Sequence, residues 1–283
     1  MYHLLLASNR HPVDKVATEF GDLPCGSVLT YQALALPTTT TTDHHPPFPL
    51  PPQTYHYATA LNENESNYYC GMTITLSDAE SLEMETREQS TNKTWHRVRS
   101  QRLTSSVFKR IISRIADFDS LAANMQRQKR AVQTRAMKRG LEMEPIAAAQ
   151  YEQATGNHTL PCGFIINPHA PHLGASPDRK VVDSAGLLQG LLEVKCPDVD
   201  SLVECCYLSA GPDGAFALKP NHEYHYQVMG QMGITGMMWC DFFVHCTNDY
   251  HLERIHFDAE KWESMKTKLD IFFFEYFLPA LCR

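Results

Sequence analysis

The chain has 283 residues, 43% of them hydrophobic, which is enough to fill the core of one ordinary domain with an appendage. It contains no apolar run near the ~20 residues of a transmembrane helix, and its start, residues 1–7, lacks the basic residues of a secretory signal. We therefore expect a soluble, intracellular protein with no membrane partner, located in the nucleus if eukaryotic and otherwise in the cytoplasm.

The net charge of −7 argues at first against nucleic acid, because duplex binding requires Lys and Arg to neutralise phosphates. The distribution of charge reverses this argument. Residues 93–139 contain thirteen Lys or Arg and two acids, a balance of +11, which leaves −18 for the remainder. A solvated helix face would explain a charge run equally well, but this asymmetry predicts a surface that faces phosphates.

The cysteines show no pattern typical of a metal site. They number nine, and no Cys-x-x-Cys pair occurs. Reduced, mostly buried thiols are favoured over a zinc site.

Residues 1–75 show little periodicity. The stretch 37–52 holds five consecutive threonines and six of the seventeen prolines, and it is predicted to be a linker or extended arm. Ser77 and Glu80 have the spacing of a capping box, so a helix is expected from there to about Glu88. The predicted organisation is an N-terminal arm and linker over 1–75, of unknown function, and one domain over 76–283.

Three further helices are predicted in the first half of that domain. Apolar residues recur at intervals of three and four from Val107 to Ile115, after a start at Thr104. A third helical stretch covers about 122–138. Another runs from about 142 to 154 and ends at Gly156, with Pro145 placed in its first turn, where a missing N–H costs little.

The pattern changes to strands over residues 164–197, where short apolar runs alternate with Pro and Gly. A helix is then expected over 223–235, a strand over 239–247 and a closing helix over 259–277. This order of elements predicts a mixed α/β or α+β domain.

The strand 191–195 carries two charges at alternate positions, so Glu193 and Lys195 project from the same face. Asp178 ends a strand-like segment fifteen residues earlier, and residues 181–186 supply a strand and a turn between the two sites. A hairpin would bring Asp178 beside Glu193.

Two converging carboxylates form a hard-oxygen site suited to Mg²⁺ or Mn²⁺, with the backbone carbonyl of Val194 as a further ligand. Lys195 could then orient or help to deprotonate a water and neutralise charge on a scissile phosphate. The alternative is a structural ion network of Asp178, Glu193 and Lys195.

The same residues carry a family resemblance. Gly-Ala-Ser-Pro-Asp at 174–178 and Leu-Glu-Val-Lys-Cys-Pro at 192–197 resemble the catalytic core of the PD-(D/E)xK nucleases, and specifically of the YqaJ viral recombinase family related to phage lambda exonuclease. The resemblance covers about residues 76–283. It implies a restriction-endonuclease-like core, in which helices flank a central mixed β-sheet.

Residues 95–99, followed by Thr-Ser-Ser at 104–106, resemble the N-terminal motif of that family. An arginine and a serine of the motif help to hold the 5′ phosphate of the DNA end, and Arg99 and Ser106 are the matching positions. A helix N-terminus beside an arginine is a sensible phosphate pocket. Without the resemblance, a solvated Arg99 and a Ser106 in the first helical turn explain the motif equally well.

The resemblance also assigns roles to one more acidic residue and to one glutamine. Glu144 falls on the family's additional acidic residue, which holds a second metal or a metal-bound water, and Glu142 is the competing choice. Gln227 matches the glutamine that supports the active-site lysine and water, whereas Gln231, one turn later, has no carried-over role.

Two histidines near the start of the 223–235 helix need a separate interpretation. His222 and His225 could be metal ligands, but capping or surface roles are the favoured reading.

The preferred hypothesis is a metal-dependent DNA nuclease, acting as a 5′-to-3′ exonuclease on linear duplex ends in recombination or repair. An endonuclease of the same superfamily is the alternative catalytic activity. A DNA-binding recombination accessory module without hydrolysis is the alternative from another class, and it rests on the +11 segment. Relatives pass one strand to a single-strand annealing protein, and lambda exonuclease forms a ring of subunits, so such a partner and a homo-oligomer are both compatible with the resemblance.

Overall fold

The computed structural model describes residues 15–18, 21–24, 45–57, 60–127, 135–212 and 214–283. The chain divides into two compact units, residues 1–44 and 45–283. The first contains a two-stranded antiparallel hairpin of β1 (Lys15–Thr18) and β2 (Gly21–Pro24), which the sequence analysis did not anticipate. Of the predicted linker, residues 37–44 lie outside the described residues, and residues 45–52 form no helix or strand, as expected.

The second unit begins at His45, so it includes residues 45–75, which we expected to belong to the N-terminal arm. This segment is fixed by buried apolar side chains and by backbone hydrogen bonds. Phe48 and Leu50 are buried, and Leu50 N–H donates to the carbonyl of Thr235 at 3.1 Å. The ammonium groups of Lys180 and Lys266 donate to backbone carbonyls of the segment at 2.9 Å each.

The N-terminal helices of this unit differ from the predicted ones at their ends. Helix α2 (Glu63–Cys70) was not predicted, because it buries no residue and therefore shows no apolar stripe. Helix α3 spans Leu76–Glu85 and is capped by Thr75, whose hydroxyl accepts from Asp78 N–H at 3.1 Å; the cap is not Ser77.

The basic region also folds differently from the prediction. The third predicted helix is observed as α6 (Phe118–Gln126), and residues 128–134 lie outside the described part of the chain. Helix α7 runs unbroken over Arg135–Thr155, so Pro145 is interior rather than in the first turn. Pro145 is exposed, and tertiary packing of Ala147 and Tyr151 offsets the hydrogen bond that proline removes. Gly156 follows the helix with φ of 72°, as a C-terminal glycine should.

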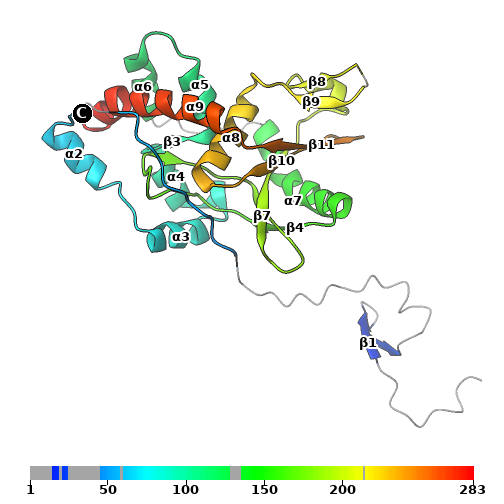
Figure 1. Cartoon of the computed structure of the whole chain (residues 1–283). Coiled ribbons are helices and arrows are strands. Elements are labelled where there is room, and N and C mark those ends of the chain that lie inside the picture. Colours follow the sequence, from blue (N-terminus) through cyan, green and yellow to red (C-terminus); the bar gives the residue numbers. More distant parts are fainter. Residues whose placement is uncertain (1–14, 19–20, 25–44, 58–59, 128–134, 213) are drawn as a thin grey trace, which may run out of the picture. The chain divides into compact units, whose positions relative to one another are not determined.

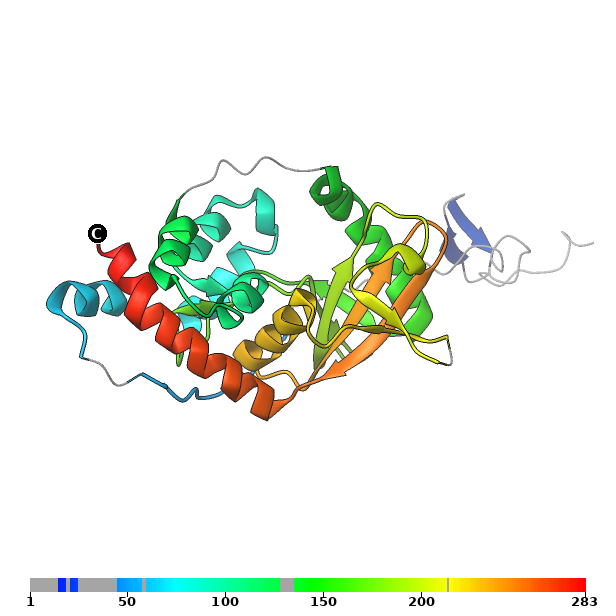
Figure 2. The same ribbon diagram turned by 90° about the horizontal axis from the view of Figure 1, so that it is seen from above.

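The central sheet has five strands in the order β11-β10-β7-β6-β4, and only the pair β7–β10 is parallel. In Figure 1, α8 and α9 lie above strands β10 and β11, and α7 lies below them. The view in Figure 2 shows α8 and α9 crossing beside the sheet. This is the predicted mixed sheet flanked by helices. The strands are β4 (His158–Pro161), β6 (Arg179–Val182), β7 (Leu188–Lys195), β10 (Trp239–His245) and β11 (Tyr250–His256).

Strand β7 separates two cores because its side chains alternate between the faces of the sheet. Leu192 and Val194 pack with Tyr151 of α7. Leu191 joins the larger core with residues of α8 and α9. Glu193 shares the parity of Leu191, so its carboxylate lies on the α8 side.

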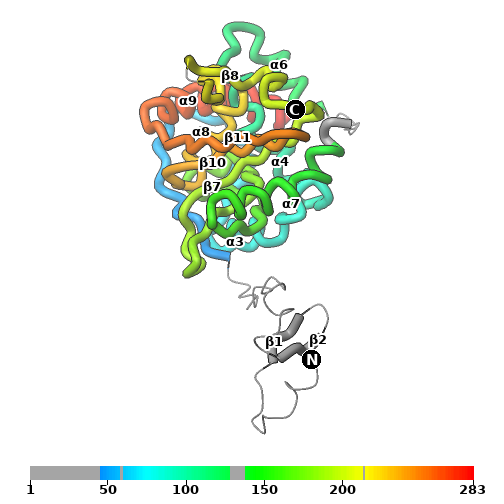
Figure 3. Tube along the Cα trace, turned by 90° about the vertical axis from the view of Figure 1, so that its right-hand side faces the viewer, coloured from blue at the N-terminus to red at the C-terminus, as the bar shows by residue number. Residues whose placement is uncertain are grey.

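The C-terminal elements follow the prediction with two differences. Helix α8 spans Glu223–Thr235 as predicted, whereas β11 was not predicted because its residues alternate only weakly between buried and exposed. The closing helix α9 (Ala259–Phe272) passes into a π-helical turn, η4 (Phe273–Phe277), and then α10 (Leu278–Leu281). Figure 3 shows α9 and α7 on opposite sides of β7, β10 and β11.

Shorter elements complete the unit. They are η1 (Gln89–Thr91), α4 (Lys93–Ser100), β3 (Leu103–Thr104), η2 (Ser105–Val107), α5 (Phe108–Ile112), β5 (Leu173–Gly174), η3 (Leu202–Glu204), β8 (Leu208–Ala210) and β9 (Phe216–Leu218). The eight cysteines in the described residues are free thiols, and most of them are buried. None of the described helices has the length and apolar character that a bilayer crossing needs.

A pair of glycine substitutions tests this packing. A Cβ at Gly163 would overlap the backbone oxygen of Glu83, whereas a Cβ at Gly140 meets nothing within 4 Å. We expect Gly163→Ala to lower the free energy of unfolding by about 2 kcal/mol or more, and Gly140→Ala, inside α7, to raise it by about 0.5–1 kcal/mol. Urea titration of both variants measures the difference; equal effects would contradict the packing described.

Candidate active site

The Glu193 carboxylate is the centre of the candidate site. Only 2% of its side chain is exposed, so its charge is stable only with hydrogen-bond partners. Helix α8 supplies two of them. Gln227 Nε2 donates to Oε1 at 2.6 Å, and Gln231 Nε2, one helical turn later, donates to Oε2 at 2.7 Å.

Lys195 lies two residues further along β7, on the same face. Its ammonium donates to Glu193 Oε1 at 2.5 Å and lies 4.5 Å from the centre of the Tyr224 ring. Burial lowers the pKa of Lys195, but the carboxylates of Glu193 and Asp178 outweigh burial and raise it above the ordinary lysine value. In this arrangement Lys195 is therefore a charged hydrogen-bond donor rather than a base.

Asp178 reaches the site through the β6–β7 hairpin, as the sequence predicted. Register places Arg179 opposite Leu192, and Asp178 Oδ2 accepts from Val194 N–H at 2.7 Å. Burial and the nearby Glu193 carboxylate raise the pKa of Asp178 well above its ordinary value. Val194 therefore meets Asp178 through its N–H, and its carbonyl remains only a predicted ligand.

Helix α7 packs on the face of the sheet opposite to α8 and contributes a third carboxylate. Glu144 Oε1 accepts from Arg179 Nη2 at 3.3 Å, and burial followed by repulsion from Glu193 raises its pKa despite that arginine. Glu142 is instead exposed and 3.7 Å from Lys138. Of the two competing glutamates, Glu144 is the one whose charge interacts with the site.

These carboxylates are chemically suited to a hard divalent cation. No three Asp, Glu, His or Cys side chains among the described residues are grouped closely enough to enclose an ion. Mg²⁺, however, needs only one or two carboxylates because it keeps several waters. Asp178 Oδ1 accepts no hydrogen bond from a described residue, and Glu193 Oε2 accepts one, so both retain lone pairs. Asp178 and Glu193 would hold the ion, with Glu144 near its waters.

A separate polar group surrounds Arg99 of α4. Its guanidinium donates to Ser176 Oγ at 3.3 Å and to Ser106 Oγ at 3.5 Å, and it stacks on the Trp95 ring at 4.0 Å. Trp95 Nε1 also donates to Ser176 Oγ at 3.0 Å. Burial lowers the pKa of Arg99 to about 10, which keeps it cationic at neutral pH. Arg99 and Ser106, predicted together, do meet.

Sequence reasoning missed two residues of these groups. Ser176 connects Arg99 to the loop that ends at Asp178, and its place two residues before Asp178 in the 174–178 motif was a usable signal. Gln231 was noted on the same helical face as Gln227, but its contact with Glu193 depends on the fold.

The two candidate histidines have structural contacts. His222 is the N-cap of α8, where its Nδ1 accepts from Tyr224 N–H at 3.3 Å. His225 Nδ1 lies 3.0 Å from the ammonium of Lys261. His222 therefore has the capping role that we favoured, whereas His225 is half-buried against Lys261 and is not a surface residue.

Comparison with known sequences decides the family. The profile of the YqaJ-like viral recombinase domain matches residues 94–238, about half of the chain. The chain belongs to this family. The matched residues of the YqaJ domain contain every side chain of the carboxylate site and of the Arg99 group, from Trp95 to Gln231.

Solved structures of two exonucleases are similar to this chain. The alkaline exonuclease LHK-Exo of Laribacter hongkongensis, solved alone and in complex with dAMP, is 30% identical, with a TM-score of 0.54 over 68% of this chain and 94% of its own. A phage-related exonuclease from Haemophilus somnus is 12% identical, with a TM-score of 0.45 over 64% of this chain and 95% of its own. No protein with a curated description matches. YqaJ membership and the likeness to LHK-Exo support a nuclease of the recombinase-exonuclease type.

The predicted metal site can be tested without measuring cleavage. In chelator, Asp178→Asn is expected to raise the melting temperature by about 2–4 °C, which corresponds to roughly 1 kcal/mol. The amide keeps an acceptor for Val194 N–H but removes the repulsion with Glu193. Added Mg²⁺ or Mn²⁺ should raise the melting temperature of the wild type and not of this variant.

Glu142→Gln, at an exposed position of α7, is the matched control and should respond to metal as the wild type does. Equal metal-induced shifts in wild type and Asp178→Asn would show that Asp178 holds no ion.

Proposed function

We propose that this chain is a Mg²⁺- or Mn²⁺-dependent DNA nuclease that hydrolyses phosphodiester bonds as a 5′-to-3′ exonuclease on linear double-stranded DNA. The observation that carries the proposal is the connection of two groups through one loop. Ser176 contacts Arg99, and Asp178, two residues later, contacts the strand of Glu193 and Lys195. A nuclease that acts from an end needs such a fixed distance between the terminal phosphate and the scissile bond.

Arg99, Ser106 and Ser176 would hold the 5′-terminal phosphate. The guanidinium supplies fixed positive charge, and the hydroxyls donate once the phosphate replaces their present contacts. The Trp95 ring stacks on the Arg99 guanidinium, so the orientation of the guanidinium is set before DNA binds.

Around the scissile phosphate, a bound metal ion would polarise the phosphoryl oxygen and lower the pKa of a water. Asp178 and Glu193 would hold that ion. Gln227 and Gln231 keep the Glu193 carboxylate in one orientation. Lys195, which lies beside Glu193, would donate to the attacking water and neutralise charge that develops on the phosphate. Glu144 would orient a water at the edge of the site.

The wider assignments rest on this chemistry. A role in recombination or repair, a single-strand annealing protein as partner, and a homo-oligomer are proposed together with the exonuclease activity. An endonuclease would use the same carboxylates but would not need the Arg99 group.

Lys195→Ala tests the catalytic centre. The substitution should lower the rate of metal-dependent DNA hydrolysis at least about 100-fold, because it removes a donor aimed at developing charge. DNA affinity should change little, because Lys195 is largely buried, is paired with Glu193 and lies outside the basic segment 93–139. Lys268→Ala, at an exposed position of α9, is the matched control. Unchanged hydrolysis by Lys195→Ala would refute the assignment.

Arg99→Ala tests the terminal-phosphate pocket. The wild type should hydrolyse a 5′-phosphorylated duplex about 10- to 100-fold faster than a 5′-hydroxyl duplex, as expected for losing a charged hydrogen-bond pair. Arg99→Ala should remove that preference by slowing only the phosphorylated substrate. The control is Arg97→Ala, an exposed arginine of the same helix. A preference that survives Arg99→Ala would place the end phosphate elsewhere.

A further inference from the structure

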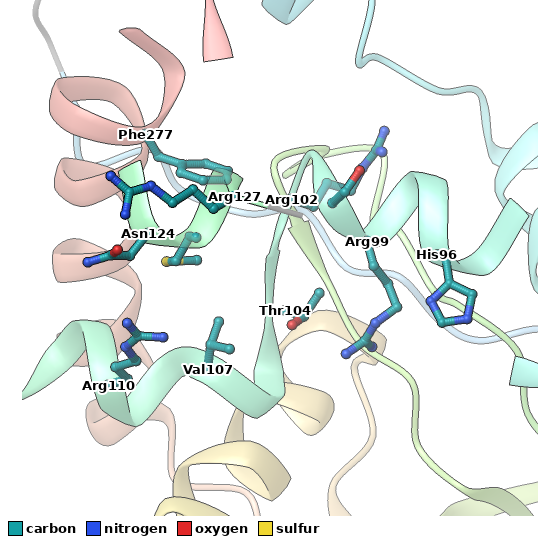
Figure 4. A pocket seen from close by; sticks show the side chains of 11 residues that line it. His96, Arg99, Arg102, Thr104, Val107, Arg110, Asn124, Arg127 and Phe277 are labelled. Atoms are coloured by element: carbon teal, nitrogen blue, oxygen red, sulfur yellow. The ribbon is translucent and has the colours of Figure 1, made fainter. Parts of the chain in front are cut away.

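A pocket of about 330 Å³ lies beside Arg99, between α4, α5, α6 and η4. Its lining includes Arg99 but none of the carboxylates of the candidate active site. In Figure 4 the guanidinium groups of Arg99 and Arg110 point toward each other from opposite sides of the pocket, and Arg127 lies on the side of Arg110. Arg99 is therefore shared between the terminal-phosphate group and a second cavity.

The pocket gathers positive charge without acidic partners. Arg110 and Arg127 are exposed and form no ion pair with any described residue, and no Asp or Glu lines the pocket. Arg114, one turn after Arg110, shows the contrast, because it pairs with Asp117 at 3.1 Å. Like charges around one cavity repel, so an anion between them would stabilise the arrangement.

Arg102 also lines the pocket, but its charged group is engaged elsewhere. Its guanidinium donates to the backbone carbonyls of Pro171, Val98 and Met72 at 2.8–3.1 Å. Figure 4 shows this group turned away from Arg99 and Arg110. Of the other arginines that line the cavity, Arg99 is held by Ser176 and Ser106, whereas the side chains of Arg110 and Arg127 have no hydrogen-bond or ion-pair partner among the described residues.

The remaining lining is partly apolar. Val107, Met125 and Phe277 line the pocket, and Thr104 and Asn124 add polar groups. A cavity with cationic donors on one side and apolar groups on another suits a nucleotide, whose phosphate and base have these two characters. The volume also falls in the range of about 300–1,000 Å³ that small-molecule sites occupy.

The position of the pocket selects which DNA strand can reach it, given the proposed function. If Arg99 holds the 5′-terminal phosphate and the carboxylates hold the next phosphate, the cleaved strand runs from Arg99 toward Glu193. Nothing of that strand precedes its own 5′ end. DNA beyond Arg99 therefore belongs to the complementary strand, whose 3′ portion becomes unpaired as its partner is degraded.

We propose that this pocket binds one nucleotide of the unpaired 3′ strand, with its phosphate at Arg110 and Arg127 and its base against Val107 and Met125. The inference rests on the proposed 5′-to-3′ direction. The site would retain the protein on the DNA after each cut, because the 3′ strand lengthens while the 5′ end recedes.

The test is binding of fluorescent DNA in chelator, where no hydrolysis occurs. The three DNAs share one 5′-phosphorylated duplex and have a blunt end, a 3′ overhang or a 5′ overhang. The wild type should bind the 3′ overhang most tightly. The double variant Arg110→Ala/Arg127→Ala should lose about 10- to 30-fold in affinity for the 3′ overhang and no more than about 3-fold for the blunt duplex. For the 3′ overhang, the slope of log affinity against log salt concentration should be shallower by about 0.7 in this variant, which is the value for one single-strand phosphate.

The matched control is Lys93→Ala/Arg97→Ala, which removes the same charge from exposed positions outside the pocket. It should affect all three DNAs equally. The proposal fails if the wild type shows no preference for the 3′ overhang, or if the Arg110/Arg127 variant weakens all DNAs to the same extent. It also fails if deoxyadenosine monophosphate alone displaces the overhang at similar concentration, because the pocket would then hold a released nucleotide.

A parallel measurement separates this proposal from the proposed function. Hydrolysis of the blunt duplex by the wild type in Mg²⁺ reports on the active site alone. Hydrolysis from 5′ ends without any overhang preference would overturn only the pocket assignment. Absence of hydrolysis would overturn the proposed function itself.

Discussion

Glu193 holds a charge in the middle of the central sheet, and the rest of the site is arranged around that constraint. A buried carboxylate costs several kcal/mol unless donors replace its lost water. Two glutamines one helical turn apart and the ammonium of Lys195 supply those donors, which requires α8 to lie directly over β7. The same packing buries Val228 and Met232 in the larger core, so the helix that hydrogen-bonds the Glu193 carboxylate also stabilises the fold.

The loop before β6 then links recognition to chemistry. Its serine contacts Arg99, its aspartate contacts β7, and only the rigid Pro177 separates them. Pro177 is further held by Gln89, which donates to its carbonyl at 3.0 Å. The backbone of this loop, rather than a flexible side chain, would therefore fix the distance between a terminal phosphate bound at Arg99 and the carboxylates.

Much of this arrangement could be predicted because local patterns determine it. The alternation of Glu193 and Lys195, the turn before β7 and the helix 223–235 are all properties of short segments. The packing of residues 45–57 against the rest of the unit could not be predicted, because two of their carbonyls accept hydrogen bonds from Lys180 and Lys266, far away in sequence. Helix α2 lacks an apolar stripe, and the interior position of Pro145 depends on packing of α7 against β7 and β10. The contact of Gln231 with Glu193 could not be predicted either, because it depends on the packing of α8 against β7.

The most direct test of the account is a time course with purified protein on linear duplex DNA bearing 5′ phosphates and on a covalently closed circle, each in Mg²⁺ and in chelator. An end-dependent exonuclease should degrade the linear DNA alone, only in Mg²⁺, and release mononucleotides from the 5′ ends. Cleavage of the closed circle would contradict the end-dependent mechanism. Binding of both DNAs without any metal-dependent product would contradict the catalytic role of Asp178, Glu193 and Lys195.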